Sequence, residues 1–220
     1  MTGREFKDIV FEQFAKIAHA FSSPKRLEII DILAQGERDV DSLSRQVNMT
    51  IANTSRHLQI LKNARLVESR KAGVQVIYRL AGAEVLHCYN HLQSLAEKRS
   101  VEIREIVRVF FEERDGMEPI SKDELWQRIQ DDDVVVIDVR PEVEYQKGHI
   151  AGAISVPLSQ LKDKIAEIPQ DREIVAYCRG PYCVLSAEAT SMLRGAGYKA
   201  KRLKEGLPEW REAGLPINQL

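Results

Sequence analysis

The chain has 220 residues, more than one typical domain and fewer than three, so its length favours two compact domains. Its 44% hydrophobic and 30% charged residues are those of an ordinary soluble protein and exclude a largely disordered or collagen-like chain. Apolar runs such as Val134–Ile137 are far too short to span a membrane, and residues 1–8 are charged where a secretion signal would be apolar. We therefore expect a cytoplasmic protein that does not bind membranes.

The net charge of −1 hides a local excess of basic residues. Between residues 45 and 71, six basic side chains stand against Glu68 alone. A basic segment of this kind can contact nucleic acid even where the whole chain is near neutral. The three cysteines are too few for a disulfide framework, and in a reducing compartment they are better interpreted as thiols available for chemistry.

The first half of the chain, residues 1–114, predicts a mainly helical domain. Apolar residues recur at helical spacing, a proline stands at the start of the second helix, and Gly73 marks the bend of a hairpin. The expected helices are 6–21, 24–35, 42–47 capped by Asp41, 51–64 capped by Thr50, and about 83–113, and the expected strands are 66–70 and 74–80. The last helix is amphipathic along its whole length, which indicates a partner, most simply a second copy of the chain.

The second half, residues 118–220, follows the linker Arg114–Pro119 and alternates strands with helices. Ser121 and Glu124 are spaced as a capping box at its start. This pattern predicts an α/β domain with a mainly parallel sheet. The expected strands are 134–139, 154–156, 173–177 and 199–203, and the expected helices are 122–130, 142–147, 159–168, 184–196 and 208–213. The whole chain is therefore expected to be an α+β two-domain protein.

Two short helices joined by Asn48–Thr50 and followed by a basic hairpin meet the requirements of a winged helix-turn-helix, whose second helix enters the major groove of DNA. Asn53 can pair with adenine and Arg56 with guanine or phosphate. The alternative is that the basic residues form the solvated face of a helical bundle. The predicted DNA contacts are Ile51, Ala52, Asn53, Ser55 and Arg56 on the helix, Ser44, Arg45 and Thr50 around the turn, and Arg70 and Lys71 on the hairpin.

The segments Phe21–Leu33 and Asn53–Val67 resemble the ArsR/SmtB family of bacterial winged-helix repressors. The resemblance covers roughly residues 8–100. It implies a homodimer that binds an inverted-repeat operator and leaves it when an inducer arrives. The two recognition helices would then lie about one DNA turn, roughly 34 Å, apart.

A metal site is not expected. Members of this family that sense metals often carry a Cys-x-Cys pair on the helix that corresponds to 42–47, where this chain has no cysteine. His87 and His91, near Cys88, are spaced to bind zinc, but packing in a dimer interface or exposure to solvent explains them better. His57 is interpreted as a structural or phosphate-contacting residue. We expect neither a metal nor another cofactor.

Cys178 lies between a predicted buried strand and a predicted helix. Backbone N–H groups at a helix N-terminus and the helix dipole stabilise a thiolate, which is the nucleophilic form of cysteine. The neighbouring Arg179 adds positive charge that could help to bind an anionic sulfur donor. Gly180, Pro181 and Tyr182 complete a tight loop that could hold a persulfide on Cys178. The alternative is that Cys178 is a small buried residue at a strand end.

The segments Asp138–Pro157 and Lys204–Trp210 resemble the two signatures of the rhodanese family, and the resemblance extends over residues 118–216. Cys178 falls at the position of the catalytic cysteine of that family. The resemblance implies sulfur transfer, in which Cys178 takes sulfane sulfur from a donor and passes it to a thiophilic acceptor. Four other residues of these signatures are expected to support the fold rather than to catalyse: Asp138, Arg140, Glu144 and His149.

The loop from Cys178 to Cys183 has six residues, the size associated with sulfur transfer in this family. Rhodaneses that use thiosulfate commonly carry a basic residue at the sixth position, so Cys183 favours a less anionic donor such as a low-molecular-weight persulfide or polysulfide. We hypothesise that Cys183 is a resolving thiol that closes a disulfide or trisulfide with Cys178. The alternative is that Cys183 only packs at the helix start.

Three functions are consistent with these patterns. The first is a transcriptional repressor that senses sulfane sulfur through a persulfide on Cys178. The second is primarily a sulfurtransferase with an accessory DNA-binding domain. The third is a repressor that senses arsenite or another thiophilic inducer through Cys178 and Cys183. The sequence leaves open whether the protein turns over as an enzyme.

Overall fold

The computed structural model describes residues 1–113 and 119–219, in two compact units, Met1–Ala96 and Glu97–Leu220. Each unit has its own hydrophobic core. The sequence predicted domains of 1–114 and 118–220. Because residues 114–118 lie outside the described part of the chain, that linker stays a prediction.

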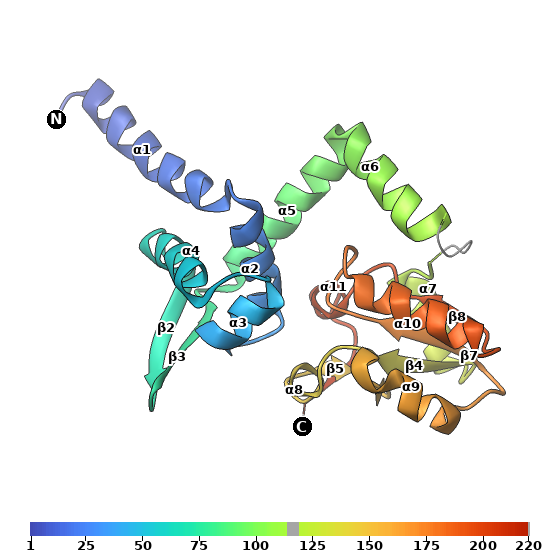
Figure 1. Ribbon diagram of the computed structural model, residues 1–220. Helices are drawn as coiled ribbons and strands as arrows, with labels where there is room; N and C mark the ends of the chain where they lie inside the picture. The colour runs from blue at the N-terminus through green and yellow to red at the C-terminus, as the bar shows by residue number, and fades with distance from the viewer. Residues whose placement is uncertain (114–118, 220) are drawn as a thin grey trace. The chain divides into compact units, whose positions relative to one another are not determined.

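The N-terminal unit is a helical domain with a small antiparallel sheet whose strand order is β1-β3-β2 (Figure 1). Thr50 caps α4 as predicted, since its hydroxyl accepts from the amide of Asn53. The predicted cap Asp41 is wrong: Asp39 has the extended backbone of a cap and accepts from the amide of Ser42 at 2.8 Å. The elements are α1 (Gly3–Phe21), α2 (Pro24–Ala34), β1 (Arg38–Asp39), α3 (Val40–Gln46), α4 (Ile51–Asn63), β2 (Val67–Ala72), β3 (Gln75–Leu80) and α5 (Ala83–Arg99), whose residues from Glu97 on belong to the second unit.

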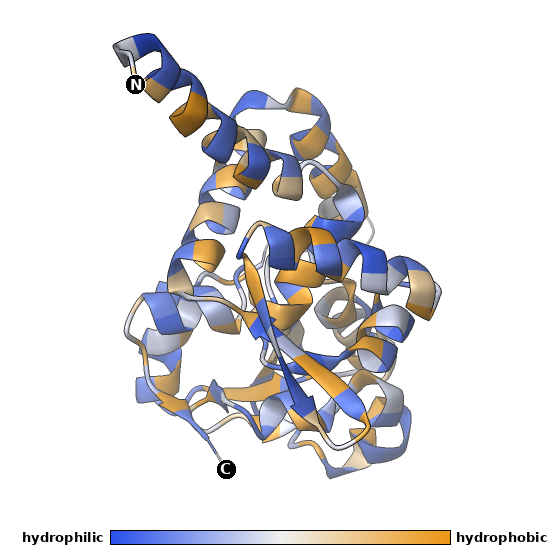
Figure 2. Cartoon of the chain, turned by 90° about the vertical axis from the view of Figure 1, so that its left-hand side faces the viewer, coloured by the Kyte–Doolittle hydropathy of each residue, from blue (hydrophilic) through white to orange (hydrophobic). Residues whose placement is uncertain are grey.

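Helix α1 leaves most of its apolar stripe uncovered. Its last two residues, Ala20 and Phe21, join the core of the N-terminal unit. Earlier in the helix, Phe6 is 52% exposed and Phe14 is 60% exposed. Figure 2 shows hydrophobic and hydrophilic residues side by side along this helix. A continuous apolar stripe that stays open to solvent is typical of a surface that packs against a partner.

The predicted single helix over 83–113 is wrong, because the chain breaks at Ser100. Helix α5 ends there, and the chain continues as α6 (Val101–Arg108) and the π-helical turn η1 (Val109–Glu113). Ser100 has an extended backbone, and its hydroxyl accepts from the amide of Ile103 at 3.2 Å. Serine at this position therefore caps a new helix instead of continuing the old one. Arg104 donates to the last carbonyl groups of α5 and completes the turn.

The C-terminal unit contains a four-stranded parallel sheet of order β6-β4-β7-β8, which confirms the predicted class. The two-residue strands β5 and β9, which pair with each other, were missed because they are too short to show a period. The elements are α7 (Lys122–Gln130), β4 (Val134–Asp138), α8 (Glu142–Tyr145), β5 (His149–Ile150), β6 (Ile154–Ser155), η2 (Leu158–Gln160), α9 (Leu161–Lys164), η3 (Ile165–Glu167), β7 (Glu173–Tyr177), α10 (Val184–Gly195), β8 (Ala200–Arg202), α11 (Leu207–Glu212) and β9 (Ile217–Asn218).

The central strand β4 is buried on both faces, so it reads as a continuous apolar run rather than an alternating one. Val135 and Ile137 face one core cluster, which contains residues of α9 and α10. Val134 and Val136 face the other, which contains residues of α7 and α11. Figure 1 shows these helices around the sheet. The carboxyl ends of β4 and β7 are thereby held side by side.

A buried cluster of polar side chains occupies those strand ends. Asp138 and Arg140 form an ion pair with both side chains fully buried, at 2.6 Å between Nη2 and Oδ2. The Tyr177 hydroxyl donates to the same Asp138 carboxylate at 2.5 Å and accepts from the amide of Ile150 at 3.1 Å. Burial and the charge of Asp138 raise the pKa of Tyr177 well above its ordinary value, so the phenol remains a donor. The fold-supporting role expected of Asp138 and Arg140 fits this geometry.

Substituting Arg140→Met tests this cluster. The change leaves the Asp138 charge buried without its partner, so we expect the free energy of unfolding to fall by about 3–5 kcal/mol. Urea unfolding followed by fluorescence measures it, because both tryptophans of the chain, Trp126 and Trp210, lie in the C-terminal unit. Arg172→Met, which breaks the exposed pair with Asp132, is the control and should cost about 0–1 kcal/mol. Equal losses in the two variants would contradict the assignment.

Candidate functional site

The exposed face of α4 carries the residues predicted to read bases. Thr54, Leu58 and Leu61 are buried in the unit, so they set which side of the helix faces inward. The turn before α4 contains Asn48, whose φ of +50° suits asparagine better than a branched residue. The exposed side chains of its first turns are Ile51, Ala52, Asn53, Ser55 and Arg56. The structure therefore brings these five candidates together on one open surface.

The candidates around this helix differ in how accessible they are. Ser44 is buried, and its hydroxyl donates to the Asp41 carbonyl at 2.8 Å, which leaves it poorly placed for a phosphate. Arg45 is exposed and pairs with Asp41. On the wing, Arg70 pairs with Glu37 at 2.7 Å, and Lys71 stands exposed beside the bend. Exposed ion pairs of this strength can be exchanged for a phosphate at small cost.

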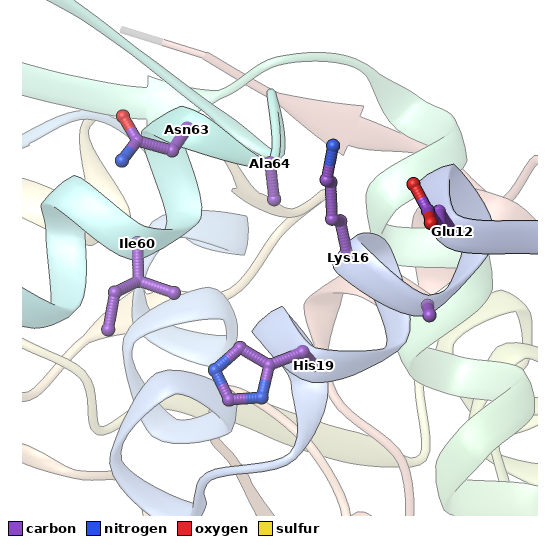
Figure 3. A pocket seen from close by; sticks show the side chains of 7 residues that line it. Glu12, Lys16, His19, Ile60, Asn63 and Ala64 are labelled. Atoms are coloured by element: carbon purple, nitrogen blue, oxygen red, sulfur yellow. The ribbon is translucent and has the colours of Figure 1, made fainter. Parts of the chain in front are cut away.

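His57 directly follows Arg56 on α4 but is only partly exposed. The Nδ1 atom of His57 is buried and has no hydrogen-bond partner among the described residues, and burial together with the charge of Arg26 lowers its pKa. A neutral imidazole in this position favours the structural role over phosphate contact. A pocket of about 500 Å³ lies at the other end of α4 (Figure 3). Its walls are Glu12, Ala15, Lys16 and His19 of α1 and Ile60, Asn63 and Ala64.

In the C-terminal unit, Cys178 and Cys183 are joined by a disulfide, with their Cα atoms 6.1 Å apart. Cys178 directly follows β7 and is 1% exposed, and Cys183 is the residue that precedes α10. A turn between them is closed by the amide of Cys183, which donates to the carbonyl of Gly180 at 3.1 Å. The predicted six-residue loop is thus a closed ring of chain between a buried strand and a helix N-terminus.

Gly206 packs directly against this loop, a contact that sequence reasoning missed. A Cβ atom at position 206 would stand 2.3 Å from the carbonyl carbon and oxygen of Arg179 and 2.4 Å from the amide nitrogen of Gly180. The next residue, Leu207, donates its amide to the carbonyl of Cys178 at 3.4 Å. The segment that resembles the second rhodanese signature therefore covers the cysteine loop, and its glycine is required because backbone lies on backbone.

The charge of Arg179 is compensated within the fold. Its guanidinium forms a two-pronged pair with the buried carboxylate of Glu144, at 2.8 Å from Nη2 to Oε1 and 3.1 Å from Nε to Oε2. Arg179 was predicted to help bind an anionic donor. A guanidinium that is paired with a carboxylate attracts an added anion more weakly than an unpaired one. The carboxylate here belongs to Glu144 of α8.

We searched the described residues for metal-binding clusters and for membrane-spanning helices. The part of the chain that the structure describes contains no group of three or more His, Cys, Asp or Glu side chains arranged to hold a metal ion. His91 Nδ1 lies 2.7 Å from the carbonyl oxygen of His87, and Cys88 is exposed. No helix within 1–113 and 119–219 has the length and apolar character of a membrane span.

The fold and the two sites define a protein with a winged helix-turn-helix and a rhodanese-like domain. Residues 23–69 match the family described as bacterial regulatory protein, arsR family, and residues 121–213 match the rhodanese-like domain. The chain is 40% identical over 214 residues to the HTH-type transcriptional regulator Rv0324 of Mycobacterium tuberculosis, which covers 97% of this chain and 93% of that protein. The chain therefore belongs to the arsR-family transcriptional regulators that carry a C-terminal rhodanese-like domain.

Each half of the chain also has relatives of its own. Over 99 residues, 44% of this chain, it is 35% identical to a protein of Allochromatium vinosum named sulfurtransferase, 92% of which is covered. A solution structure described as the homodimeric winged helix-turn-helix DNA-binding domain of Mb0332 from Mycobacterium bovis is 34% identical, with a TM-score of 0.42. It covers 45% of this chain, and 90% of that structure is matched.

Arg56→Ala tests the predicted DNA face. We expect DNA affinity to fall by about 1–3 kcal/mol, because a bidentate contact to a base or a phosphate is lost. Fluorescence anisotropy at fixed salt measures the affinity, with a duplex that the protein selects from a random-sequence pool. Arg172→Ala removes the same charge from the C-terminal unit and should leave affinity nearly unchanged. An equal loss of DNA affinity in both variants would show that only net charge matters, and would contradict a specific contact by Arg56.

Gly206→Ala tests the packing of the cysteine loop. The added methyl group forces the backbone of residues 179–180 to move, so we expect a destabilisation of about 1–3 kcal/mol. We also expect slower closure of the disulfide from the reduced protein, measured by mass spectrometry after timed alkylation. In Gly195→Ala, the added methyl group meets no atom within 4 Å, so this variant should retain both properties. If Gly206→Ala closed the disulfide at the unaltered rate, the loop would not depend on this contact.

Proposed function

We propose that this regulator is a homodimeric repressor that binds an inverted-repeat operator and releases it when sulfane sulfur reacts at Cys178. The observation that supports the proposal most is the Cys178–Cys183 bond inside a loop that matches the rhodanese-like domain. Two thiols that can reach each other at the end of a buried strand form a site where a sulfur donor can leave a lasting covalent change.

Helices α4 and α1 provide the surfaces proposed for DNA binding and for dimerisation. Exposed polar and basic residues on the first turns of α4 suit contact with the major groove. The uncovered stripe of α1, together with exposed apolar residues such as Leu95 of α5, suits association with a second copy. A two-fold dimer would present two recognition helices to two half-sites roughly 34 Å apart.

The chemistry proposed for the loop proceeds in two balanced steps. In the first, the Cys178 thiolate attacks the outer sulfur of a low-molecular-weight persulfide, so that Cys178 carries the persulfide and the donor leaves as a thiolate. In the second, the Cys183 thiolate attacks Sγ of Cys178 and forms the disulfide, while the outer sulfur leaves as hydrosulfide. The two cysteines are oxidised and the sulfane sulfur is reduced. A cellular thiol returns the pair to the reduced form.

The electrostatics of the loop favour a persulfide over thiosulfate as the donor. The guanidinium of Arg179 is engaged by Glu144, and the sixth loop position carries Cys183 in place of a cation. Thiosulfate carries two negative charges and needs cationic partners when it leaves water. A small persulfide carries at most one and places less demand on the site.

A second candidate function is sulfur transfer with turnover. The C-terminal half resembles a protein named sulfurtransferase, and the loop has the length associated with sulfur transfer in the rhodanese family. A sulfurtransferase passes its persulfide sulfur to an acceptor in every cycle, whereas the proposed sensor ends each event as a disulfide. The amount of transferred sulfur per protein molecule therefore separates the two functions.

Cysteine substitutions test the sensing mechanism. After treatment with polysulfide, we expect the wild-type protein to lose two hydrogens by mass spectrometry and to release its selected DNA duplex. Cys183→Ser should instead gain one sulfur atom and stop at the persulfide, because its resolving thiol is absent. Cys178→Ser should do neither and should stay bound to DNA. A hundredfold loss of operator affinity in the wild type corresponds to about 2.7 kcal/mol of coupling.

Two controls define the outcome. Cys88→Ser removes the exposed cysteine outside the loop and should respond like the wild type. Arsenite, added in place of polysulfide, should leave the DNA complex intact. Release by arsenite alone, or an unaltered polysulfide response of Cys178→Ser, would contradict the proposal.

A further inference from the structure

One hydrogen bond ties the cysteine loop to the end of helix α5. Tyr182, the residue before Cys183, donates its hydroxyl to Oε1 of Glu97 at 2.5 Å. Both residues belong to the C-terminal unit, which begins at Glu97. A short bond between a phenol and a carboxylate is charge-assisted and stronger than a bond between neutral groups.

The surroundings of Tyr182 keep it a donor. Burial, the hydrogen bond to Glu97 and the charge of that carboxylate all raise the pKa of Tyr182. The phenol therefore keeps its proton throughout the physiological range, and the bond does not depend on pH there. A movement of the loop backbone can change this hydrogen bond, because Tyr182 lies within the ring that the two cysteines close.

Glu97 lies where a displacement of the cysteine loop would be transmitted to helix α5. It lies in the last turn of α5, just before the chain breaks at Ser100, and Arg104 holds its carbonyl at 2.7 Å. The same helix contributes Val85 and Tyr89 to the core of the N-terminal unit. A continuous helix moves as a rod, so a shift at its last turn reaches its packed end.

The other end of the segment that contains Glu97, residues 97–113, contacts the C-terminal unit outside the cysteine loop. Phe111, in the π-helical turn η1, is buried, and the guanidinium of Arg202 lies 4.1 Å from the centre of its ring. Arg202 belongs to β8 and not to the cysteine loop. Among the described contacts of residues 97–113, the one at Phe111 thus involves the sheet, and the one at Glu97 involves the cysteine loop.

We propose that Tyr182 is the positioning residue that reports the state of the cysteine pair to helix α5 through Glu97. Closing the disulfide brings the Cα atoms of Cys178 and Cys183 to 6.1 Å and sets the backbone that carries Tyr182. The reduced loop lacks this constraint, and its hold on Glu97 weakens. The disulfide form thus favours one placement of the α5 end, the one that releases DNA. This inference rests on the proposed sensing function and adds its route.

Tyr182→Phe removes the hydroxyl and keeps the ring. We expect polysulfide to close its disulfide as in the wild type, while the difference in DNA affinity between reduced and disulfide forms shrinks about tenfold or more, the loss expected for a hydrogen bond to a charged group. Amide hydrogen exchange of residues 93–99 is the second readout. It should be slower in the disulfide form of the wild type and equal in the two forms of the variant.

Tyr198→Phe is the matched control, because its hydroxyl donates at 2.5 Å to the carbonyl of Ile165, outside the loop and α5. It should keep the full response. Glu97→Ala should behave like Tyr182→Phe, and the double variant should lose no more than either single one. A wild type that forms no disulfide or keeps its DNA would sink the proposed function. A Tyr182→Phe variant that forms the disulfide and responds fully would overturn this inference alone.

Discussion

The C-terminal unit depends on the buried carboxylate of Asp138. A charge at the end of a central strand is tolerable only if every lone pair is matched, and here Arg140 and the hydroxyl of Tyr177 match it. Tyr177 is the last residue of β7, so the same bonds hold the strand end from which the cysteine loop departs. Cys178 thus follows a strand end that is hydrogen-bonded to the buried ion pair at the end of the neighbouring strand.

The loop that follows β7 is closed by a disulfide, and the charge of its arginine is compensated. Glu144 compensates Arg179 from one side, and Gly206 lies against the backbone from another. Between these two contacts, Cys178 and Cys183 are bonded to each other. Under the proposed function, this arrangement would give the regulator a covalent signal that differs from metal binding, since a disulfide persists after its donor has left. The Tyr182–Glu97 bond, which we propose as the route of this signal, joins the cysteine loop to the last turn of α5.

Local signals predicted most of the fold. The apolar run of β4, the hydroxyl cap of α4 and the glycine bend of the wing each act over a few residues, and the structure has all three. The prediction was wrong at the start of α3, where Asp39 is the cap instead of Asp41. It was also wrong at Ser100, where no new helix was expected. The strands β5 and β9 were missed because two residues carry no period, and their pairing depends on chain brought from far away.

By itself, the sequence determined the two classes of domain, their main strands and the identity of the cysteine loop, because hydrophobic period, caps and signature residues are local features. Only the tertiary structure decided that Arg179 is compensated by Glu144, that Ser44 is turned inward and that Gly206 and Tyr182 contact residues distant in the chain. Such contacts join positions separated by 26 to 85 residues in three of these cases. Packing brings those positions together, and no local pattern encodes which partners will meet.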